Sequence, residues 1–189
     1  TFAPAAPSLA VPAVFMRVPP MSPCPCVYLP DPRNDCPCSP NDIKRYTARL
    51  SGPLLDRIDL HIEVPAVPYE DLSAPRKSEG SREMAERIAE ARDVQTKRYA
   101  AFARENNGAP RCRTNADLAG DMFETFCKLD GDGIHFMRQA VDSLALSARA
   151  YTRILRIART IADMEKEKSI STPHLAEAVN CRFLDRQGA

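Results

Sequence analysis

The sequence predicts an α+β fold in which a small mixed region precedes a mostly helical one. In the first region, residues 1–64, two short apolar runs with the character of strands flank one capped helix. Proline, serine and charged residues dominate residues 65–81, which indicates a linker. Residues 82–186 show the apolar periodicity of a helical bundle. Because two strands do not make a stable sheet alone, we expect the rest of the sheet to lie outside this sequence.

Each element of the first region has its own signal. The apolar run AVFMRV (13–18) predicts a buried strand, and the alternation in DLHIEVP (59–65) predicts a second strand. Between them, Ser39 has the character of an N-cap, Pro40 suits the first helical position, and Asp42 follows the cap by three residues. These three residues predict a helix that begins at Pro40.

The second region predicts about five helices, of which the first covers residues 82–104. Its apolar side is formed by Met84, Ile88 and Ala91. The later helices begin after or at residues typical of caps and turns: Asn115, Gly133, Ser147 and Thr172. A bundle of this size can bury a modest core of its own.

The composition is that of a globular protein: 44% of the residues are hydrophobic, 27% are charged, and the net charge is +1. This charge predicts neither nucleic acid nor membrane as a partner. No membrane span and no signal peptide are evident, so we expect a cytoplasmic protein with reduced thiols. The sequence begins at Thr1 without an initiator methionine, and we interpret it as a fragment or a processed piece.

Four of the seven cysteines form two Cys-Pro-Cys units: Cys24, Cys26, Cys36 and Cys38. Four thiolates are a ligand set that Zn²⁺ favours, so one interpretation is a structural zinc site. Structural sites more often use Cys-x₂-Cys spacing. Two alternatives therefore stay open: four reduced thiols in a proline-stiffened loop, or disulfides formed on oxidation.

The segment LSARAYTRILRIARTIADME (146–165) predicts an amphipathic helix with arginines along one face. These are Arg149, Arg153, Arg156 and Arg159. Asp163 offers Arg159 an i,i+4 partner, but the helix has no acidic partner for the others. One interpretation is a solvated surface; the other is a phosphate site near the helix N-terminus.

The stretches CPCVYLPDPRNDCPCSPNDIKRYTARLSGPLLDRIDLHIEVPAVPYEDL (24–72) and LSARAYTRILRIARTIADMEKEKSISTPHLAEAVNCRFLDR (146–186) resemble the C-terminal part of magnesium-chelatase-like AAA+ ATPases of the ComM/YifB competence type. The resemblance runs from about Ala10 to Arg186. It implies the end of an AAA+ core followed by a helical lid, in a homo-oligomeric ring that would be a hexamer. It also implies ATP and Mg²⁺ as cofactors and DNA as a partner, with helicase-like branch migration during competence, and no membrane.

The resemblance assigns roles to two arginines. Arg57, in SGPLLDRID, matches the arginine finger, which reaches the γ-phosphate bound by the neighbouring subunit. Arg149, in LSARA, matches the second sensor arginine, which projects from the lid onto the nucleotide of its own subunit. Without the resemblance, Arg57 would be interpreted as an ion-pair partner of Asp56 or Asp59.

The sequence also departs from the family pattern. It contains no G-x-x-x-x-G-K-[ST] motif and no apolar run ending in Asp-Glu, so we expect no ATP hydrolysis by this chain alone. Ser22 stands where the family has the sensor asparagine that positions the attacking water. Val27 stands where the family has a glycine, and we expect it to strain a turn that needs a positive φ.

Three functions stay open at this stage. The first is the end of a ring-forming ATPase that remodels DNA. The second is a magnesium-chelatase-type subunit that remodels a protein partner. The third is a truncated, non-enzymatic product that acts as a binding module and carries zinc in its cysteine loop.

Overall fold

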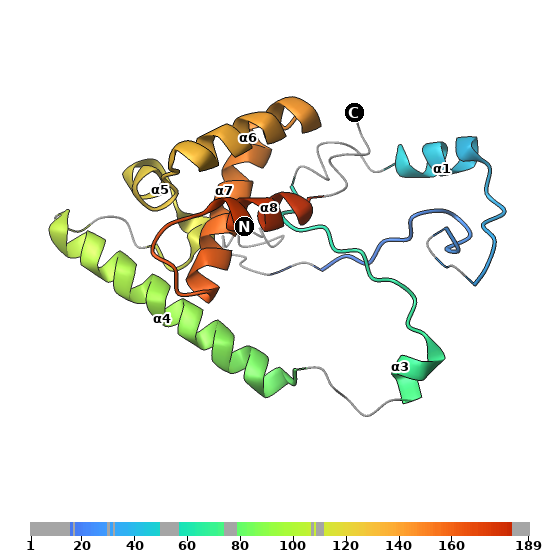
Figure 1. Cartoon of the computed structure of the whole chain (residues 1–189), viewed down its shortest axis with the longest axis horizontal. Coiled ribbons are helices and arrows are strands. Elements are labelled where there is room, and N and C mark those ends of the chain that lie inside the picture. The colour runs from blue at the N-terminus through green and yellow to red at the C-terminus, as the bar shows by residue number, and fades with distance from the viewer. Residues whose placement is uncertain are drawn as a thin grey trace, which may run out of the picture. The chain divides into compact units, whose positions relative to one another are not determined.

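The computed structural model describes residues 16, 18–29, 31, 33–49, 57–73, 79–106, 108 and 112–182. The chain divides into two compact units, residues 1–49 and 50–189, and each is treated separately below. All regular elements in the described ranges are helices (Figure 1). None of these helices combines the length and the apolar character needed to cross a membrane.

The predicted α+β class is therefore wrong for the described residues, which contain no strand. Residues 59–65 are extended but form no ladder, and the amide of His61 donates instead to the carbonyl of Cys181 at 2.6 Å. A strand exists only beside another strand that completes its hydrogen bonds, and the described chain offers none. The predicted strand 13–18 falls mostly outside the described residues. Its two described members, Met16 and Val18, are exposed rather than buried.

The first unit contains the cysteine loop and helix α1 (Pro40–Thr47). The predicted start of this helix is confirmed: the amide of Asp42 donates to the Ser39 hydroxyl at 3.2 Å, and the amide of Ser39 donates back to the Asp42 carboxylate at 3.3 Å. This reciprocal capping box satisfies amides that the first turn leaves without helical partners. No residue of α1 is buried.

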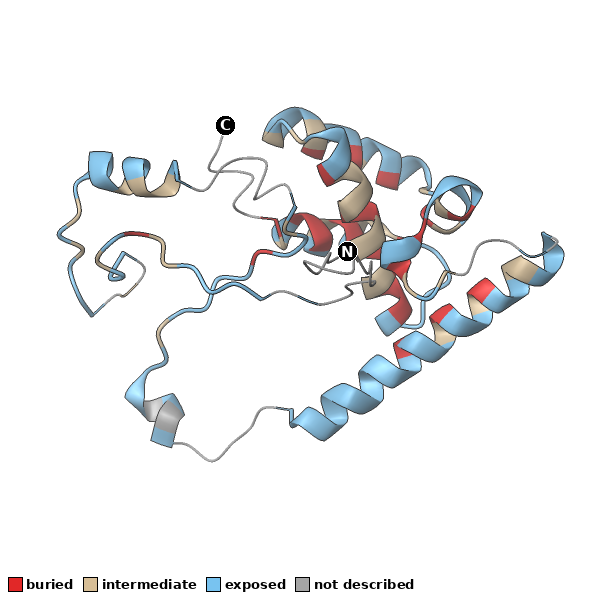
Figure 2. Cartoon of the chain, turned by 180° about the vertical axis from the view of Figure 1, so that it is seen from behind, coloured by how far each residue is buried: buried red, intermediate tan, exposed pale blue. Residues whose placement is uncertain are grey.

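The second unit begins with a short helix, α3 (Tyr69–Ser73), inside the stretch predicted to be a linker, and continues with the long helix α4 (Ser81–Glu105). Only the second half of α4 packs against the core, through Ala91, Gln95 and Tyr99. The first ten residues of α4 are exposed (Figure 2), so Met84 and Ile88 lie outside the core, whereas Ala91 on the same predicted apolar side is buried. The predicted domain boundaries stay predictions.

The remaining elements build the core around α7. They are η1 (Asn115–Asp117), α5 (Gly120–Phe126), α6 (Gly131–Leu144), α7 (Ala148–Met164) and α8 (Thr172–Asn180). Helix α7 packs against α8, α4 and η1. Its apolar face lies in the core as predicted, with Ile154, Leu155 and Ala158 buried.

The caps of the last two helices follow from their sequences. The Ser147 hydroxyl accepts a hydrogen bond from the amide of Ala150 at 3.0 Å and begins α7 at the predicted place. Helix α8 is capped one residue earlier than predicted, by Ser171 rather than Thr172. The reason is His174, whose Nδ1 accepts from the Ser171 amide at 3.0 Å.

Candidate functional site

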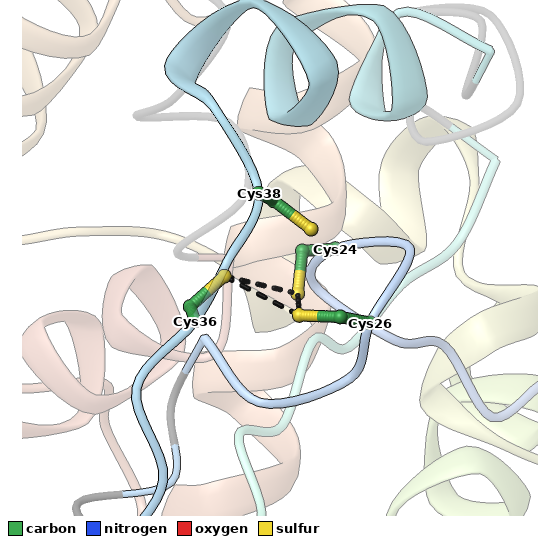
Figure 3. Close-up of side chains that lie close together, drawn as sticks. All are labelled: Cys24, Cys26, Cys36 and Cys38. Carbon is green, nitrogen blue, oxygen red and sulfur yellow. Dashed lines mark hydrogen bonds between the residues drawn. The ribbon is translucent and has the colours of Figure 1, made fainter.

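The four clustered cysteines meet at one point in the first unit, although two of them precede the other two by a long loop (Figure 3). Their sulfur atoms all lie within 4.8 Å of one another. The Sγ–Sγ distances are 3.3 Å for Cys24–Cys26, 3.4 Å for Cys26–Cys36 and 3.8 Å for Cys24–Cys36. Cys24 is buried and the other three are half-buried.

This arrangement fits a tetrahedral metal site. With Zn–S bonds of about 2.3 Å, tetrahedral geometry requires sulfur atoms about 3.8 Å apart, close to the observed separations. All four cysteines are free thiols, so the disulfide alternative is not realised in this structure. Among the described residues, no histidine joins the group. The cluster can therefore bind Zn²⁺ through four thiolates.

The thiols also influence one another's ionisation. Desolvation opposes the charged form of Cys26, but the backbone at Tyr28 and the neighbouring thiols donate to its sulfur, and together they lower the pKa of Cys26 to about 7. The pKa of Cys36 rises to about 12, because desolvation and its role as a donor to the other sulfurs outweigh a backbone hydrogen bond at Cys38. The loop thus favours the thiolate at Cys26 and the neutral thiol at Cys36.

The loop geometry confirms the strain predicted at Val27. A tight turn brings the amide of Val27 to the carbonyl of Cys24 at 3.2 Å, and Val27 has a φ of 73°. A β-branched residue rarely adopts this left-handed conformation, which glycine adopts readily. The turn holds the first Cys-Pro-Cys unit in place at a cost in backbone strain.

Ser22, the residue at the sensor position, is half-buried and precedes this turn. The strand expected to position it lies mostly outside the described residues. Its role therefore stays a prediction.

Arg57 lies exposed on a turn, followed by residues 58–68, which have no regular secondary structure. The carboxylate of Asp59, one of its two predicted ion-pair partners, instead lies 3.1 Å from Arg153 on α7. The other predicted partner, Asp56, lies outside the described residues.

Three arginines of α7 make contacts within the fold: Arg153, Arg156 and Arg159. These three are therefore neither an unpaired phosphate site nor a solvated face. Arg149 lies on the first turn and is exposed. Arg156 donates to the carbonyl of Leu118 at 2.7 Å, and Arg159 is only 2% exposed.

Arg159 belongs to a buried polar network that the sequence only partly predicts. The predicted i,i+4 pair with Asp163 is present, at 3.0 Å. Arg98 from α4 and Asn115 from η1 also donate to the same carboxylate, at 2.8 and 2.9 Å. Burial alone would raise the pKa of Asp163, but these donors and the charge of Arg159 hold that pKa below its ordinary value.

A second set of contacts, not predicted from the sequence, surrounds Arg182 at the end of the described chain. This guanidinium is 2% exposed and donates to the carbonyls of Ile58 and Asp59, at 3.0 and 3.3 Å. A lone arginine after a helix carries no sequence signal for such a role, because its acceptors are main-chain atoms 124 and 123 residues away.

Two family models match the chain. "Magnesium chelatase, subunit ChlI C-terminal" matches residues 78–182, and "Magnesium chelatase, subunit ChlI" matches residues 1–72. The two matched segments together include the cysteine cluster, Arg57 and Arg149.

Individual relatives agree with these models. The chain is 39% identical over 176 residues to "Competence protein ComM" of Haemophilus influenzae. The matched region covers 93% of this chain and 32% of that protein. It is 36% identical over 179 residues to YifB of Escherichia coli, covering 94% of this chain and 33% of that protein. The chain thus spans about a third of the length of the curated relatives that it matches. It belongs to the magnesium chelatase ChlI family, of which it carries the C-terminal region.

Proposed function

We propose that this chain is the C-terminal part of a ring-forming AAA+ ATPase and that it serves two nucleotide sites at once. Arg57 acts as an arginine finger on the nucleotide of the neighbouring subunit, and Arg149 acts as the sensor arginine on the nucleotide of its own subunit. A planar cation of this kind stabilises the charge that develops on the transferred phosphoryl group.

The observation that carries this proposal is that both arginines lie in segments matched by the magnesium chelatase ChlI family models. Arg149 also lies exposed on the first turn of α7. An arginine on a first turn opposes the helix dipole, and a bound phosphate relieves this by accepting from both the guanidinium and the helix N-terminus. The position that matches the family sensor is thus exposed at the start of a helix.

ATP and Mg²⁺ would be held mainly by residues outside this sequence, which has no phosphate-binding loop. Within the chain, Arg149 and Arg57 would contact the phosphates from opposite sides of a subunit interface. We expect no ATP turnover by the chain alone.

The test uses a chimera in which this chain replaces the matching third of the Haemophilus influenzae relative. We expect Arg57→Ala to lower kcat for ATP about 10³-fold or more while nucleotide binding persists. Arg149→Ala should weaken nucleotide affinity or hydrolysis. The matched control is Arg82→Ala, which removes an exposed arginine from the first turn of α4 and should change neither.

Mixed rings test directly whether Arg57 and Arg149 act on the nucleotides of different subunits. Subunits with Arg57→Ala keep their sensor, and subunits with Arg149→Ala keep their finger. Where the finger of the second type meets the nucleotide of the first, an intact site forms, so mixing two weak proteins should restore turnover. No gain on mixing, or normal turnover by Arg57→Ala rings, would contradict the proposal.

For the work done with this ATP, we propose the remodelling of DNA, with branch migration during competence as the specific activity. The support is the relative named as a competence protein, which matches nearly the whole chain. The names of both family models favour a second candidate, the remodelling of a protein partner as in magnesium chelatase. Stimulation of ATP hydrolysis by branched DNA supports the first candidate, and stimulation only by a protein partner supports the second.

We also propose that the four-cysteine cluster holds a structural Zn²⁺. The purified chain should contain about one zinc per chain, and Cys24→Ser or Cys38→Ser should abolish binding. Cys112→Ser, at a half-buried thiol outside the cluster, is the control and should retain the metal. Less than half a zinc per chain would reject the site.

A further inference from the structure

Hydrogen bonds to its main-chain atoms hold the segment that follows Arg57 against the helical part of the second unit. The buried guanidinium of Arg182 donates through Nη1 to the carbonyls of Ile58 and Asp59. Two residues further on, the amide of His61 donates to the carbonyl of Cys181, the C-cap of α8. These bonds fix the path of the backbone itself, whatever side chains the segment carries.

A second fastening reaches the same segment from α7. The carboxylate of Asp59 lies 3.1 Å from Nη1 of Arg153, whose side chain is only 19% exposed. Asp59 follows Arg57 by two residues, and Arg153 follows Arg149 by four, which is one helical turn. A single ion pair therefore joins the neighbourhood of the finger to the helix that carries the sensor.

The segment is thus held by two kinds of interaction: hydrogen bonds from Arg182 to its main chain, and an ion pair between Asp59 and Arg153. Arg182 is a buried cation whose hydrogen bonds are charge-assisted, and these are the stronger class. The Asp59–Arg153 pair is partly exposed, so it contributes little to the free energy of unfolding. Its main effect is to orient the segment relative to α7. Together they leave residues 58–61 little freedom to rotate relative to α7 and α8.

We propose that Arg182 and Arg153 are positioning residues that fix the segment Arg57–His61 to the helical region, so that finger and sensor move as one piece. This inference rests on the proposed roles of Arg57 and Arg149. When a nucleotide draws Arg149 toward its own site, the fastened segment carries Arg57 with it and changes its reach toward the neighbouring site. Occupancy of one site then affects catalysis at the next.

The first experiment tests the fastening on the chain as it is. Amide hydrogen exchange of residues 58–62 is compared among Asp59→Asn, Arg153→Gln and the double variant. Each single variant should accelerate exchange several-fold, and the double variant should add little, because both remove the same ion pair. Arg82→Gln, which breaks an exposed pair with Glu86, should leave these amides unchanged. Unchanged exchange in all variants would overturn the fastening.

Arg182 is tested with Arg182→Lys, which keeps the charge but loses the planar fork of donors. Exchange at the His61 amide should rise, while the core amides of α7 keep their protection. Because Arg182→Ala removes a buried guanidinium and can unfold the chain, the lysine variant and the Asp59–Arg153 variants carry the conclusion. Unchanged exchange at His61 in Arg182→Lys would remove Arg182 from the proposal.

The second experiment tests the consequence in the chimeric ring. A misplaced finger should lower kcat about tenfold or more in Arg153→Gln with little change in KM, since small misplacements at a reacting centre are costly. It should also reduce the cooperativity of ATP hydrolysis, which a merely structural role would leave intact. If Arg57→Ala abolishes turnover but Arg153→Gln and Asp59→Asn keep wild-type kcat and cooperativity, the positioning role fails and the finger stands. If Arg57→Ala turns over normally, the proposed function itself fails.

Discussion

At the scale of single residues, Val27 in the cysteine loop carries backbone strain, whereas the buried Asp163 is stabilised by hydrogen bonds. Val27 occupies a left-handed conformation on the turn that carries Cys24 and Cys26. Such a residue stores about 1–3 kcal/mol of strain. Asp163, in contrast, is fully buried but accepts hydrogen bonds from two arginines and an asparagine.

Relief of the strain at Val27 should stabilise the loop. We expect Val27→Gly to bind zinc about fivefold more tightly, a gain of about 1 kcal/mol, because glycine adopts a positive φ without a steric penalty. Competition with a chromophoric chelator measures the affinity. Val27→Ala is the matched control and should gain less, since it keeps a Cβ. Weaker zinc binding by the glycine variant would show that the turn is not strained.

Asp163 should make the helical region sensitive to acid. Its pKa is lowered on folding, so the stability it contributes is complete above its unfolded pKa, about 3.9. That stability is lost as the pH falls from there through the lower folded value.

Chemical denaturation of the wild type and Asp163→Asn tests this at pH 7 and near pH 3. At pH 7 the variant should lose about 3 kcal/mol of unfolding free energy, because two buried arginines lose their charged partner. The difference between the two proteins should shrink toward pH 3. A difference that is independent of pH would contradict the role assigned to this carboxylate.

At the scale of elements, local rules predict helices well and long-range contacts poorly. The starts of α1 and α7 follow from Ser39 and Ser147, whose caps depend on neighbours three residues away. The network around Asp163 and the contacts of Arg182 depend on partners up to 124 residues away, which no periodicity reveals. The strand expected at 59–65 has the right alternation, but a strand also needs a neighbour.

Helix α1 should depend on the metal. It has eight residues, none of them buried, and an isolated helix of this length is marginal in water. Its N-cap, Ser39, follows Cys38 directly, so metal binding would hold the start of the helix in place.

Addition of a chelator should therefore accelerate amide exchange in residues 40–48 more than in any helix of the second unit. Helix α8, which buries His174 and Leu175, is the internal reference. Equal protection of α1 with and without metal would show that the capping box suffices alone.

At the scale of the whole molecule, the segment after Arg57 exposes several apolar side chains. Leu60, Ile62 and Val64 are 48%, 74% and 80% exposed. Exposed apolar side chains that gather in one segment tend to be covered by another chain.

We expect the isolated chain to self-associate as its concentration rises, and Ile62→Thr with Val64→Thr to suppress this. Sedimentation velocity measures the change. Ile134→Thr, at an exposed apolar residue of α6, is the control and should not suppress association. Association that persists unchanged in the double variant would place the contact elsewhere.

The position of Arg182 also sets an order of events during synthesis. The carbonyl of Ile58 accepts a hydrogen bond from Arg182, which is synthesised 124 residues later. A nascent chain that stops before this arginine can complete α4, α6 and α7, but the carbonyls of Ile58 and Asp59 lack the donor that Arg182 supplies. A chain that stops short of Arg182 therefore holds the segment Arg57–His61 less firmly than a chain that includes this arginine.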